Sequence, residues 1–342
     1  MGALMAIAPI PGVDRGMPLE RRRVVTWCNP GAGNGCDPDG LAAALRGAGR
    51  DVRVMDPGED FGASASSCPS SFDPDREIVL VAGGDGTVSL AARRLEGSGV
   101  PLAIHPTGSA NNVASSLGIV AGGDPVAALA GRVRAIDLGI AHGPWGRRAF
   151  IESVGVGALA AAERRAHEAA RRDGAETSGD YGSEGKVARG RRLIAEGLAD
   201  AAPMRARVLD PNGSAVSNDA LVFLEALNLA RTGPSLELAP DAVPDDGSLD
   251  VVLGDAAGAA VVRAACGNEG TTCPGGHLPV ERRRRLDLLC FLSELRIDGE
   301  FGADIVGSGP RTGGREGAKA PTRERITVEV LPGALLVVVP SA

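Results

Sequence analysis

Aromatic residues are scarce in this chain, and several other marks of particular protein classes are missing. Phe, Trp and Tyr make up 3% of the 342 residues, too few for the stacking platforms of single-stranded nucleic-acid binders. A net charge of -7 also lacks the basic footprint of a nucleic-acid partner. No apolar run approaches the length of about 18 residues that a membrane-spanning helix needs. We therefore expect a soluble globular protein with no nucleic-acid partner.

Recognisable cysteine motifs are missing as well. The six cysteines form no CxxC pair and show no metal-ligand spacing: Cys28, Cys36, Cys68, Cys266, Cys273 and Cys290. This favours reduced thiols in a cytoplasmic protein, with a disulfide framework as the alternative. Residues 1–20 have no basic region ahead of an apolar core, which predicts a disordered leader and not a signal peptide.

The stretch at residues 77–95 is the most informative part of the sequence. An apolar, β-branched run at 78–82 is typical of a strand buried on both faces, and the glycine turn GGDGT follows at 83–87. Apolar residues at helical spacing come next. Such a turn exposes backbone N–H groups and the positive end of a helix dipole, which suits a phosphate. Taken alone, GGDGT is equally compatible with an ordinary strand-to-helix turn.

Four further motifs stand in order along the chain. They are NPGAG at residues 29–33, PTGSANNVASSLG at 106–118, APDAVPDDGSLD at 239–250 and IDGE at 297–300. Together with GGDGT they resemble the diacylglycerol kinase catalytic family, which includes bacterial lipid kinases and sphingosine and ceramide kinases. The resemblance covers about residues 22–305. Five ordered motifs are much more specific than any one of them.

The order of elements predicts the fold class. Alternating strands and helices in the first third indicate a parallel sheet with right-handed crossovers. Later segments read as alternating strands, beginning with 135–141 and 148–154. We expect an α/β N-terminal Rossmann-like domain with a parallel sheet, plus a mostly antiparallel β-sandwich C-terminal domain.

Domain limits follow from these changes of pattern. We expect the nucleotide-binding domain at residues 21–137 and a β-rich substrate and metal domain at 138–324. The resemblance implies that a C-terminal segment at about 325–342 packs back on the first domain. Residues 57–75 lack periodicity and predict a loop. An Arg- and Ala-rich helical pair at 163–192 predicts a solvated face, with contact to anionic lipid as the alternative.

Nucleotide-binding residues are implied by the resemblance at three loops. The set is Asn29, Pro30, Gly31, Ala32, Gly33, Gly83, Gly84, Asp85, Gly86, Thr87, Val88, Ser89, Gly108, Ser109 and Asn111. Ser109 stands where the family usually has Thr, and it keeps the hydroxyl. From the residues alone, Ser109 and Asn111 are also suited to capping a helix. Neither glycine loop contains the Lys of an ordinary P-loop.

Catalytic residues are predicted in the IDGE motif. Asp298 and Glu300 flank Gly299, so both carboxylates point the same way in an extended segment. Spacing alone favours surface turn acids, but the resemblance implies that Glu300 accepts the hydroxyl proton and that Asp298 assists. Asp85 would orient Mg2+ or the acceptor.

A metal loop is implied by the tight acidic turn at residues 245–247. By similarity to bacterial lipid kinases, Asp246 and the backbone oxygens of Val243 and Ser248 would hold a structural Mg2+. From the residues alone, a DDG turn is usually just a turn. The cofactors expected are therefore ATP and Mg2+.

The function expected from the resemblance is an ATP- and Mg-dependent lipid kinase that phosphorylates the hydroxyl of diacylglycerol or a related lipid alcohol. One alternative is a kinase of the same fold that acts on a soluble or natural-product hydroxyl, since no clear amphipathic membrane helix is present. A second is a non-catalytic nucleotide-binding regulatory protein. We expect a cytoplasmic location, and we leave open peripheral contact with the inner membrane face and a homodimer.

Overall fold

The computed structural model describes residues 17–29, 36–55, 72–176, 183–210, 212–216, 220–267, 278–307 and 322–341. The chain divides into two compact units. Unit 1 comprises residues 1–138, 244–247 and 331–342, and unit 2 comprises residues 139–243 and 248–330. The leader predicted at 1–20 falls mostly outside the described residues, although a 3-10 helix is present at Leu19–Arg21. Much of the loop predicted at 57–75 also lies outside them.

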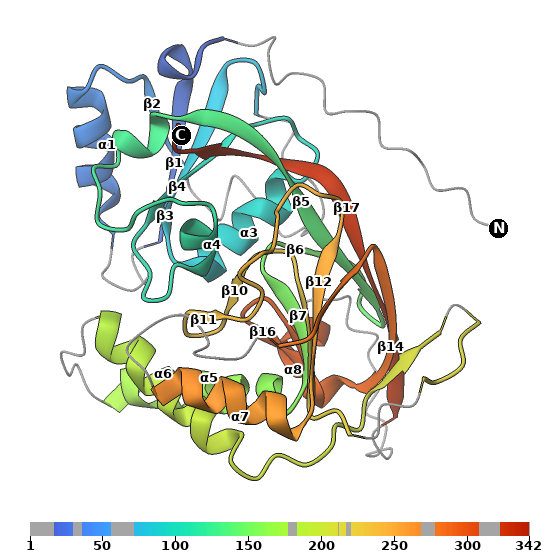
Figure 1. Ribbon diagram of the computed structural model, residues 1–342. Helices are drawn as coiled ribbons and strands as arrows, with labels where there is room; N and C mark the ends of the chain where they lie inside the picture. Colours follow the sequence, from blue (N-terminus) through green and yellow to red (C-terminus); the bar gives the residue numbers. More distant parts are fainter. Residues whose placement is uncertain are drawn as a thin grey trace. The chain divides into compact units, whose positions relative to one another are not determined.

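Unit 1 is built on a parallel sheet in the order β2-β1-β3-β4, to which the end of β17 adds by pairing Val337 with Leu102 (Figure 1). Its strands are β1 (Arg23–Cys28), β2 (Val52–Val54), β3 (Glu77–Gly83) and β4 (Leu102–Pro106). Its helices are α1 (Pro38–Gly47), α3 (Asp85–Leu95), α4 (Asn112–Ser116) and the 3-10 helix η2 (Ala127–Leu129).

The central strand of unit 1 forms as its composition predicts. All seven residues of β3 are buried, because helices cover both faces of a parallel sheet. Helix α1 begins at Pro38, and the side chain of Asp37 caps it by accepting a hydrogen bond from the N–H of Asp39 at 3.1 Å. Parallel strands bring the glycine turns after β3 and β4 to the same edge of the sheet, where α/β folds bind their ligands.

A disulfide corrects the expectation of reduced thiols. Cys28 at the end of β1 and Cys36 just before α1 are bonded, with their Cα atoms 6.0 Å apart. Cys266 and Cys290 are buried, while Cys68 and Cys273 lie outside the described residues. The sequence misled because the paired cysteines lie eight positions apart, a spacing typical of no redox or metal motif.

Unit 2 contains an antiparallel sheet in the order β13-β12-β9-β7-β15-β16. Its strands are β7 (Ser153–Gly157), β9 (Phe223–Leu227), β12 (Leu249–Gly254), β13 (Val280–Arg283), β15 (Leu295–Ile297) and β16 (Glu300–Phe301). A small two-stranded sheet holds β10 (Arg231–Thr232) and β11 (Leu236–Glu237). The remaining strands of the unit are β6 (Gly146–Phe150), β8 (Arg207–Leu209) and β14 (Arg285–Phe291).

Two long strands have residues in both units. They are β5 (Arg132–Gly143) and β17 (Arg323–Val339). Within unit 2, β5 pairs with β6, and β17 pairs with β14 in antiparallel register from Arg285 opposite Glu329 to Phe291 opposite Arg323. The single strand expected at 148–154 is two, β6 and β7, separated by a break at Ile151 and Glu152.

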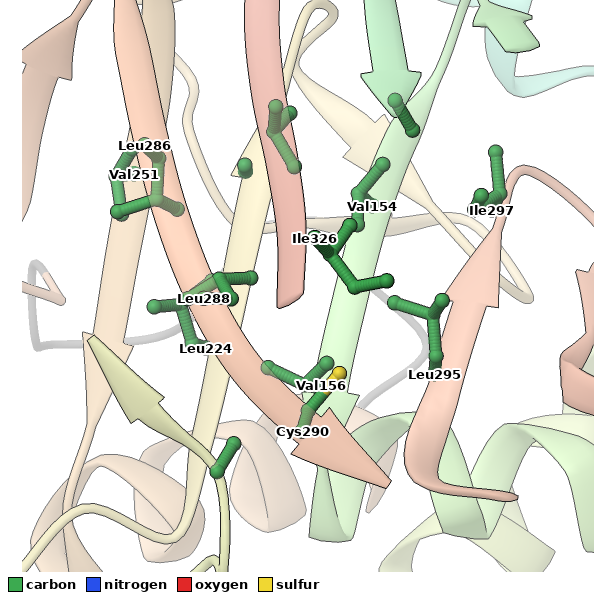
Figure 2. Close-up of a cluster of buried hydrophobic side chains, with 14 of the residues drawn as sticks. Val154, Val156, Leu224, Val251, Leu286, Leu288, Cys290, Leu295, Ile297 and Ile326 are labelled. Atoms are coloured by element: carbon green, nitrogen blue, oxygen red, sulfur yellow. The ribbon is translucent and has the colours of Figure 1, made fainter. Parts of the chain in front are cut away.

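A hydrophobic core between two layers of strands gives unit 2 its sandwich character. Figure 2 shows side chains of β7, β9, β12 and β15 meeting those of β14 and β17. Alternate residues of each strand enter this core, as Val154 and Val156 of β7 do. The α/β plus antiparallel fold class predicted from the sequence is confirmed.

The other face of the antiparallel sheet is covered by helices. They are α5 (Ala158–Glu176), α6 (Ser183–Gly197) and α7 (Ala256–Gly267), which lie together in Figure 1, and a fourth short helix, α8 (Gly302–Gly307), follows β16. Apolar residues of the first three pack on alternate residues of β9, including Phe223 and Leu227. The 3-10 helix η3 (Leu292–Glu294) joins β14 to β15. Among the described residues, no helix is both long and apolar enough to cross a membrane.

Candidate functional site

The two glycine turns of unit 1 pack backbone against backbone. A Cβ placed on Gly108 would come within 2.5 Å of the Gly84 Cα, and a Cβ on Gly84 would lie 3.1 Å from the Gly108 Cα. The N–H of Thr107 donates to the carbonyl of Gly83 at 3.0 Å, and this hydrogen bond holds the two turns side by side. The close approach of the chains therefore requires glycine at position 108 and leaves little room for a Cβ at position 84.

Asn111 shapes the second turn. Its side-chain oxygen accepts from the N–H of Gly108 at 2.9 Å, and its amide nitrogen donates to the Gly108 carbonyl at 2.8 Å. Asn111 also has a left-handed φ of 50°, a conformation that Asn tolerates better than most residues. The side chain that the sequence offered as a helix cap or ligand contact thus closes the loop on itself, and no side-chain cap is present at α4.

The GGDGT turn is tied to both of its neighbours. Asn29, after β1, donates from Nδ2 to the Thr87 hydroxyl at 2.9 Å. Asp85, the first residue of α3, accepts from the N–H of Val113 at 3.0 Å. The loops that follow three adjacent parallel strands are therefore joined by side chains from the predicted set. Asp85 holds a helix start in this arrangement, and its assignment to Mg2+ or the acceptor stays a prediction.

The start of α3 offers a place for an anion. Gly84 is the N-cap and has no side chain to occupy the helix end. Gly86 is exposed with nothing within 4 Å of an added Cβ. An 11-residue helix places partial positive charge at this end, next to the Gly108 turn. The geometry fits the phosphate groups of a nucleotide, which need close approach to backbone N–H groups.

Not all residues of the predicted nucleotide set lie at this surface. Val88 and Ser89 are 2% and 3% exposed inside the packed part of α3. Ser109 is partly exposed, next to Gly108. Pro30, Gly31, Ala32 and Gly33 lie outside the described residues. The structure therefore groups Asn29, Gly83–Thr87, Gly108 and Asn111.

In unit 2, the Asp298 side chain lies in a ring of backbone donors. Its carboxylate accepts N–H groups of Glu152 at 2.9 Å and of Ile151 and Ser153 at 3.3 Å. The N–H of Asp298 donates to the Ser153 carbonyl at 2.8 Å. Asp298 is 4% exposed and has a left-handed φ of 49°. These contacts anchor the turn between β15 and β16 on the break that precedes β7.

Glu300 follows at the start of β16 and is more accessible. Its side chain is 32% exposed and forms a salt bridge from Oε2 to Nη2 of Arg148 on β6. The two acids of the motif therefore have different surroundings, because one is buried against backbone N–H groups and the other pairs with a guanidinium. Of the two, Glu300 has the exposure that a proton acceptor for an external alcohol needs.

The acidic turn predicted to bind metal is held by unit 1. Asp245 accepts two hydrogen bonds from Arg134, at 2.6 and 2.8 Å, while Asp246 is exposed. Asp137, 2% exposed on β5, accepts the N–H groups of Gly247 and Gly333, both at 2.7 Å. Burial raises the pKa of Asp137, with Asp245 and Asp246 adding to the rise against those two hydrogen bonds.

No cluster of three His, Cys, Asp or Glu side chains with metal-binding geometry occurs in the described ranges. The predicted metal set contains one carboxylate and two backbone oxygens, so its assignment to Val243, Asp246 and Ser248 stays a prediction. Sequence reasoning missed Arg134, Asp137 and Arg148, whose partners are more than 100 residues away. No local pattern could have indicated those contacts.

Comparisons with known proteins agree with this arrangement. Residues 26–141 match the sequence profile of the diacylglycerol kinase catalytic domain. No curated protein matches the chain. A solved diacylglycerol kinase from Bacillus anthracis str. Sterne has 18% sequence identity and a TM-score of 0.59, covering 93% of this chain and 97% of its own. A second structure from that organism, provisionally assigned to the same enzyme, has 18% identity and a TM-score of 0.62, covering 94% and 98%.

The parallel sheet with its adjoining glycine turns defines unit 1 as an α/β domain of the kind that binds ligands at the carboxyl ends of its strands. More particularly, residues 26–141 match the diacylglycerol kinase catalytic domain, in agreement with the resemblance of the three motifs that lie in this segment. The likeness to these solved structures shows that the chain shares their fold.

Proposed function

We propose that this protein is an ATP- and Mg-dependent lipid kinase that transfers the γ-phosphoryl group of ATP to the hydroxyl of diacylglycerol or a related lipid alcohol. The observation that carries the proposal is the backbone packing of Gly84 against Gly108 at the start of α3, within the segment that matches the kinase domain. A nucleotide triphosphate is the ligand class that this arrangement fits best.

Phosphoryl transfer depends mainly on positioning and charge neutralisation. The turns at Gly83–Thr87 and Gly108 would hold the phosphates through backbone N–H groups, with Asn29 fixing the first turn through Thr87. Glu300 would accept the proton of the attacking hydroxyl, and Arg148 would keep its carboxylate in place. Mg2+, when bound, would neutralise charge on the phosphates, and Asp85 is the residue we assign to orienting it or the acceptor.

A second, structural Mg2+ is proposed at the acidic turn, held by Asp246 and the backbone oxygens of Val243 and Ser248. Asp246 is exposed in a segment that Arg134 and Asp137 already fix in place, which supports a site that stabilises and performs no chemistry. Thermal unfolding with and without EDTA tests this. A midpoint that falls in the wild type and not in Asp246→Asn supports the site, and equal midpoints contradict it.

The main experiment follows labelled phosphate from ATP into acceptors. The protein is incubated with Mg2+ and either diacylglycerol vesicles or a panel of soluble alcohols. Label in the vesicle lipid supports the proposal, label only in soluble alcohols supports a kinase for soluble hydroxyls, and no label in either supports a non-catalytic nucleotide-binding protein. We also propose a cytoplasmic location with peripheral membrane contact, and sedimentation of the same vesicles without ATP tests the contact. Light scattering tests for a homodimer.

A variant pair tests the role of Glu300. Glu300→Gln removes the proton acceptor and keeps an oxygen for Arg148, so we expect the phosphorylation rate to fall about 100-fold or more. Glu281→Gln removes an exposed acid of β13 and serves as the matched control. Equal rates for Glu300→Gln and the wild type would remove Glu300 from the mechanism.

A further inference from the structure

One row of polar residues lies beneath α5, on the helix-covered face of the sheet in unit 2. Strand register places Arg296 of β15 opposite Gly155 of β7, and Gly155 opposite Glu225 of β9. Their neighbours Leu295, Ile297, Leu224 and Ala226 point to the sandwich core instead. Arg296 is 2% exposed and Glu225 is fully buried.

The missing side chain at Gly155 lets this row form. A Cβ at that position would come within 2.1 Å of Glu225 Oε1, so only glycine leaves the space through which the residues on either side meet. Across it, Arg296 Nη2 donates to Glu225 Oε2 at 2.6 Å. Glu163 of α5 completes the contact from above through a salt bridge to Arg296 Nε.

The same guanidinium reaches the predicted catalytic turn. Arg296 Nη1 donates to the carbonyl oxygen of Asp298 at 2.7 Å, and Nη2 donates to the Ser153 hydroxyl at 2.9 Å. Asp298 is the residue with left-handed φ, and Ser153 provides one of the N–H groups that its carboxylate accepts. Both sides of the turn that leads to Glu300 therefore depend on one buried cation.

We propose that Arg296, held between Glu225 and Glu163, is a positioning residue that fixes the Asp298–Glu300 turn from beneath and so sets the direction of the Glu300 carboxylate. A neutral or singly donating residue could not do this. The planar guanidinium offers several N–H donors in a rigid fork, whereas the N–H donors of a lysine ammonium all come from one nitrogen atom on a flexible stem. The catalytic effect of Arg296 rests on the proposed function. Its contacts with the turn are structural and do not depend on that function.

The balance of charge explains why an arginine buried so deeply is tolerated. Glu152 lies 3.9 Å from Arg296 Nη1, so three carboxyl groups surround one guanidinium in the interior. Burying an unpaired charge is costly, and a surplus of acceptors ensures that the cation stays paired. Thr232 extends the group by donating to Glu152 at 3.1 Å and meeting the Ser153 hydroxyl at 3.0 Å.

The test measures amide hydrogen exchange, which needs no activity. In Arg296→Lys we expect the N–H groups of Ile151, Glu152, Ser153 and Asp298 to exchange at least 10 times faster than in the wild type, because the carbonyl and hydroxyl contacts of the fork are lost. Arg283→Lys, at an exposed pair on β13, is the control and should leave those rates within about twofold. Unchanged rates at the four amides in folded Arg296→Lys would overturn the proposal. Equal acceleration throughout unit 2 would also overturn it, since that indicates general loosening.

A second variant guards against simple misfolding. Glu225→Gln keeps an oxygen acceptor for Arg296, so the four amides should exchange within about twofold of the wild-type rates. If Glu225→Gln loosened the turn and Arg296→Lys did not, the assignment to Arg296 would be wrong.

Kinetics then separate positioning from mere stability. With ATP and the acceptor that the wild type phosphorylates, we expect Arg296→Lys to lower kcat at least 10-fold and to change the KM for ATP less than twofold, because the glycine turns are untouched. A rise in KM at constant kcat would contradict positioning of the proton acceptor. If the wild type phosphorylates nothing, the proposed function fails, while the exchange result still decides whether Arg296 holds the turn.

Discussion

Replacing Glu225 with Gln should stabilise unit 2 in a manner that depends on pH. Glu225 is completely buried, and burial raises the pKa of its carboxyl from 4.5 to about 8, with the charge of Glu163 contributing and Arg296 opposing. Its Oε1 has no hydrogen-bond partner among the described residues. Glu152 and Asp298 are the other carboxylates that act on Arg296, and the residue opposite Glu225 on β12 is Val252.

The sign follows from proton linkage. Between about pH 5 and pH 8 the unfolded chain has released the Glu225 proton and the folded protein still holds it, so rising pH favours unfolding. At about 1.4 kcal/mol for each pH unit, the full rise in pKa corresponds to roughly 5 kcal/mol. Burial also raises the pKa of Glu163, so the two carboxyls titrate as a pair and part of this free energy belongs to Glu163. We therefore expect Glu225→Gln to raise the free energy of unfolding by about 2 to 4 kcal/mol.

Urea unfolding of the wild type and of Glu225→Gln across this pH range is the assay. The free energy of unfolding of the variant, minus that of the wild type, should increase from about pH 5 to about pH 8 and then level off. Glu281→Gln on the surface is the control, and its difference should stay within about 0.5 kcal/mol. A difference for Glu225→Gln that stays constant with pH would refute the reasoning.

Three further changes test the remaining contacts. Gly108→Ala should destabilise unit 1 by about 1 to 3 kcal/mol in urea unfolding, because the new Cβ meets the Gly84 Cα at 2.5 Å, and an unchanged midpoint would contradict the backbone packing of the two turns. Asp137→Asn places an amide NH2 against one of the two backbone N–H groups that the carboxylate accepts, so the free energy of unfolding should fall by about 1 to 3 kcal/mol in the same assay. A variant as stable as the wild type would show that neither hydrogen bond contributes to stability. Cys28→Ser should lower stability by roughly 2 to 3 kcal/mol without dithiothreitol and by much less with it, and a loss equal under both conditions would argue against the bond to Cys36.

Local pattern was sufficient for the elements and motifs of unit 1. The all-apolar run of β3 and the glycines after it specify a buried strand and a tight turn whatever surrounds them, and Asp37 is a cap by its chemistry. The five motifs indicated a resemblance to the diacylglycerol kinase catalytic family, and the three of them that lie in residues 26–141 fall within the segment that matches that domain. The convergence of the glycine turns with Glu300 stays a prediction, because they belong to different units.

Unit 2 was predicted less well because its strands pair over long distances. The break between β6 and β7 contains no glycine or proline that would indicate it. Its N–H groups donate to the carboxylate of Asp298, about 145 residues away in the sequence. A charged residue inside the apolar strand Leu295–Ile297 was the one available clue to the buried row at Arg296.

The sequence by itself determined the class of fold, the glycine turns and the acidic pair, since each depends on the chemistry of consecutive residues. Only the tertiary structure decided which of those acids is buried and which accessible, and that Cys28 and Cys36 are bonded. The physical reason is that burial, charge pairing and strand register depend on residues that are far apart in the sequence and that only the fold brings together. The residues adjacent in the chain do not identify those partners.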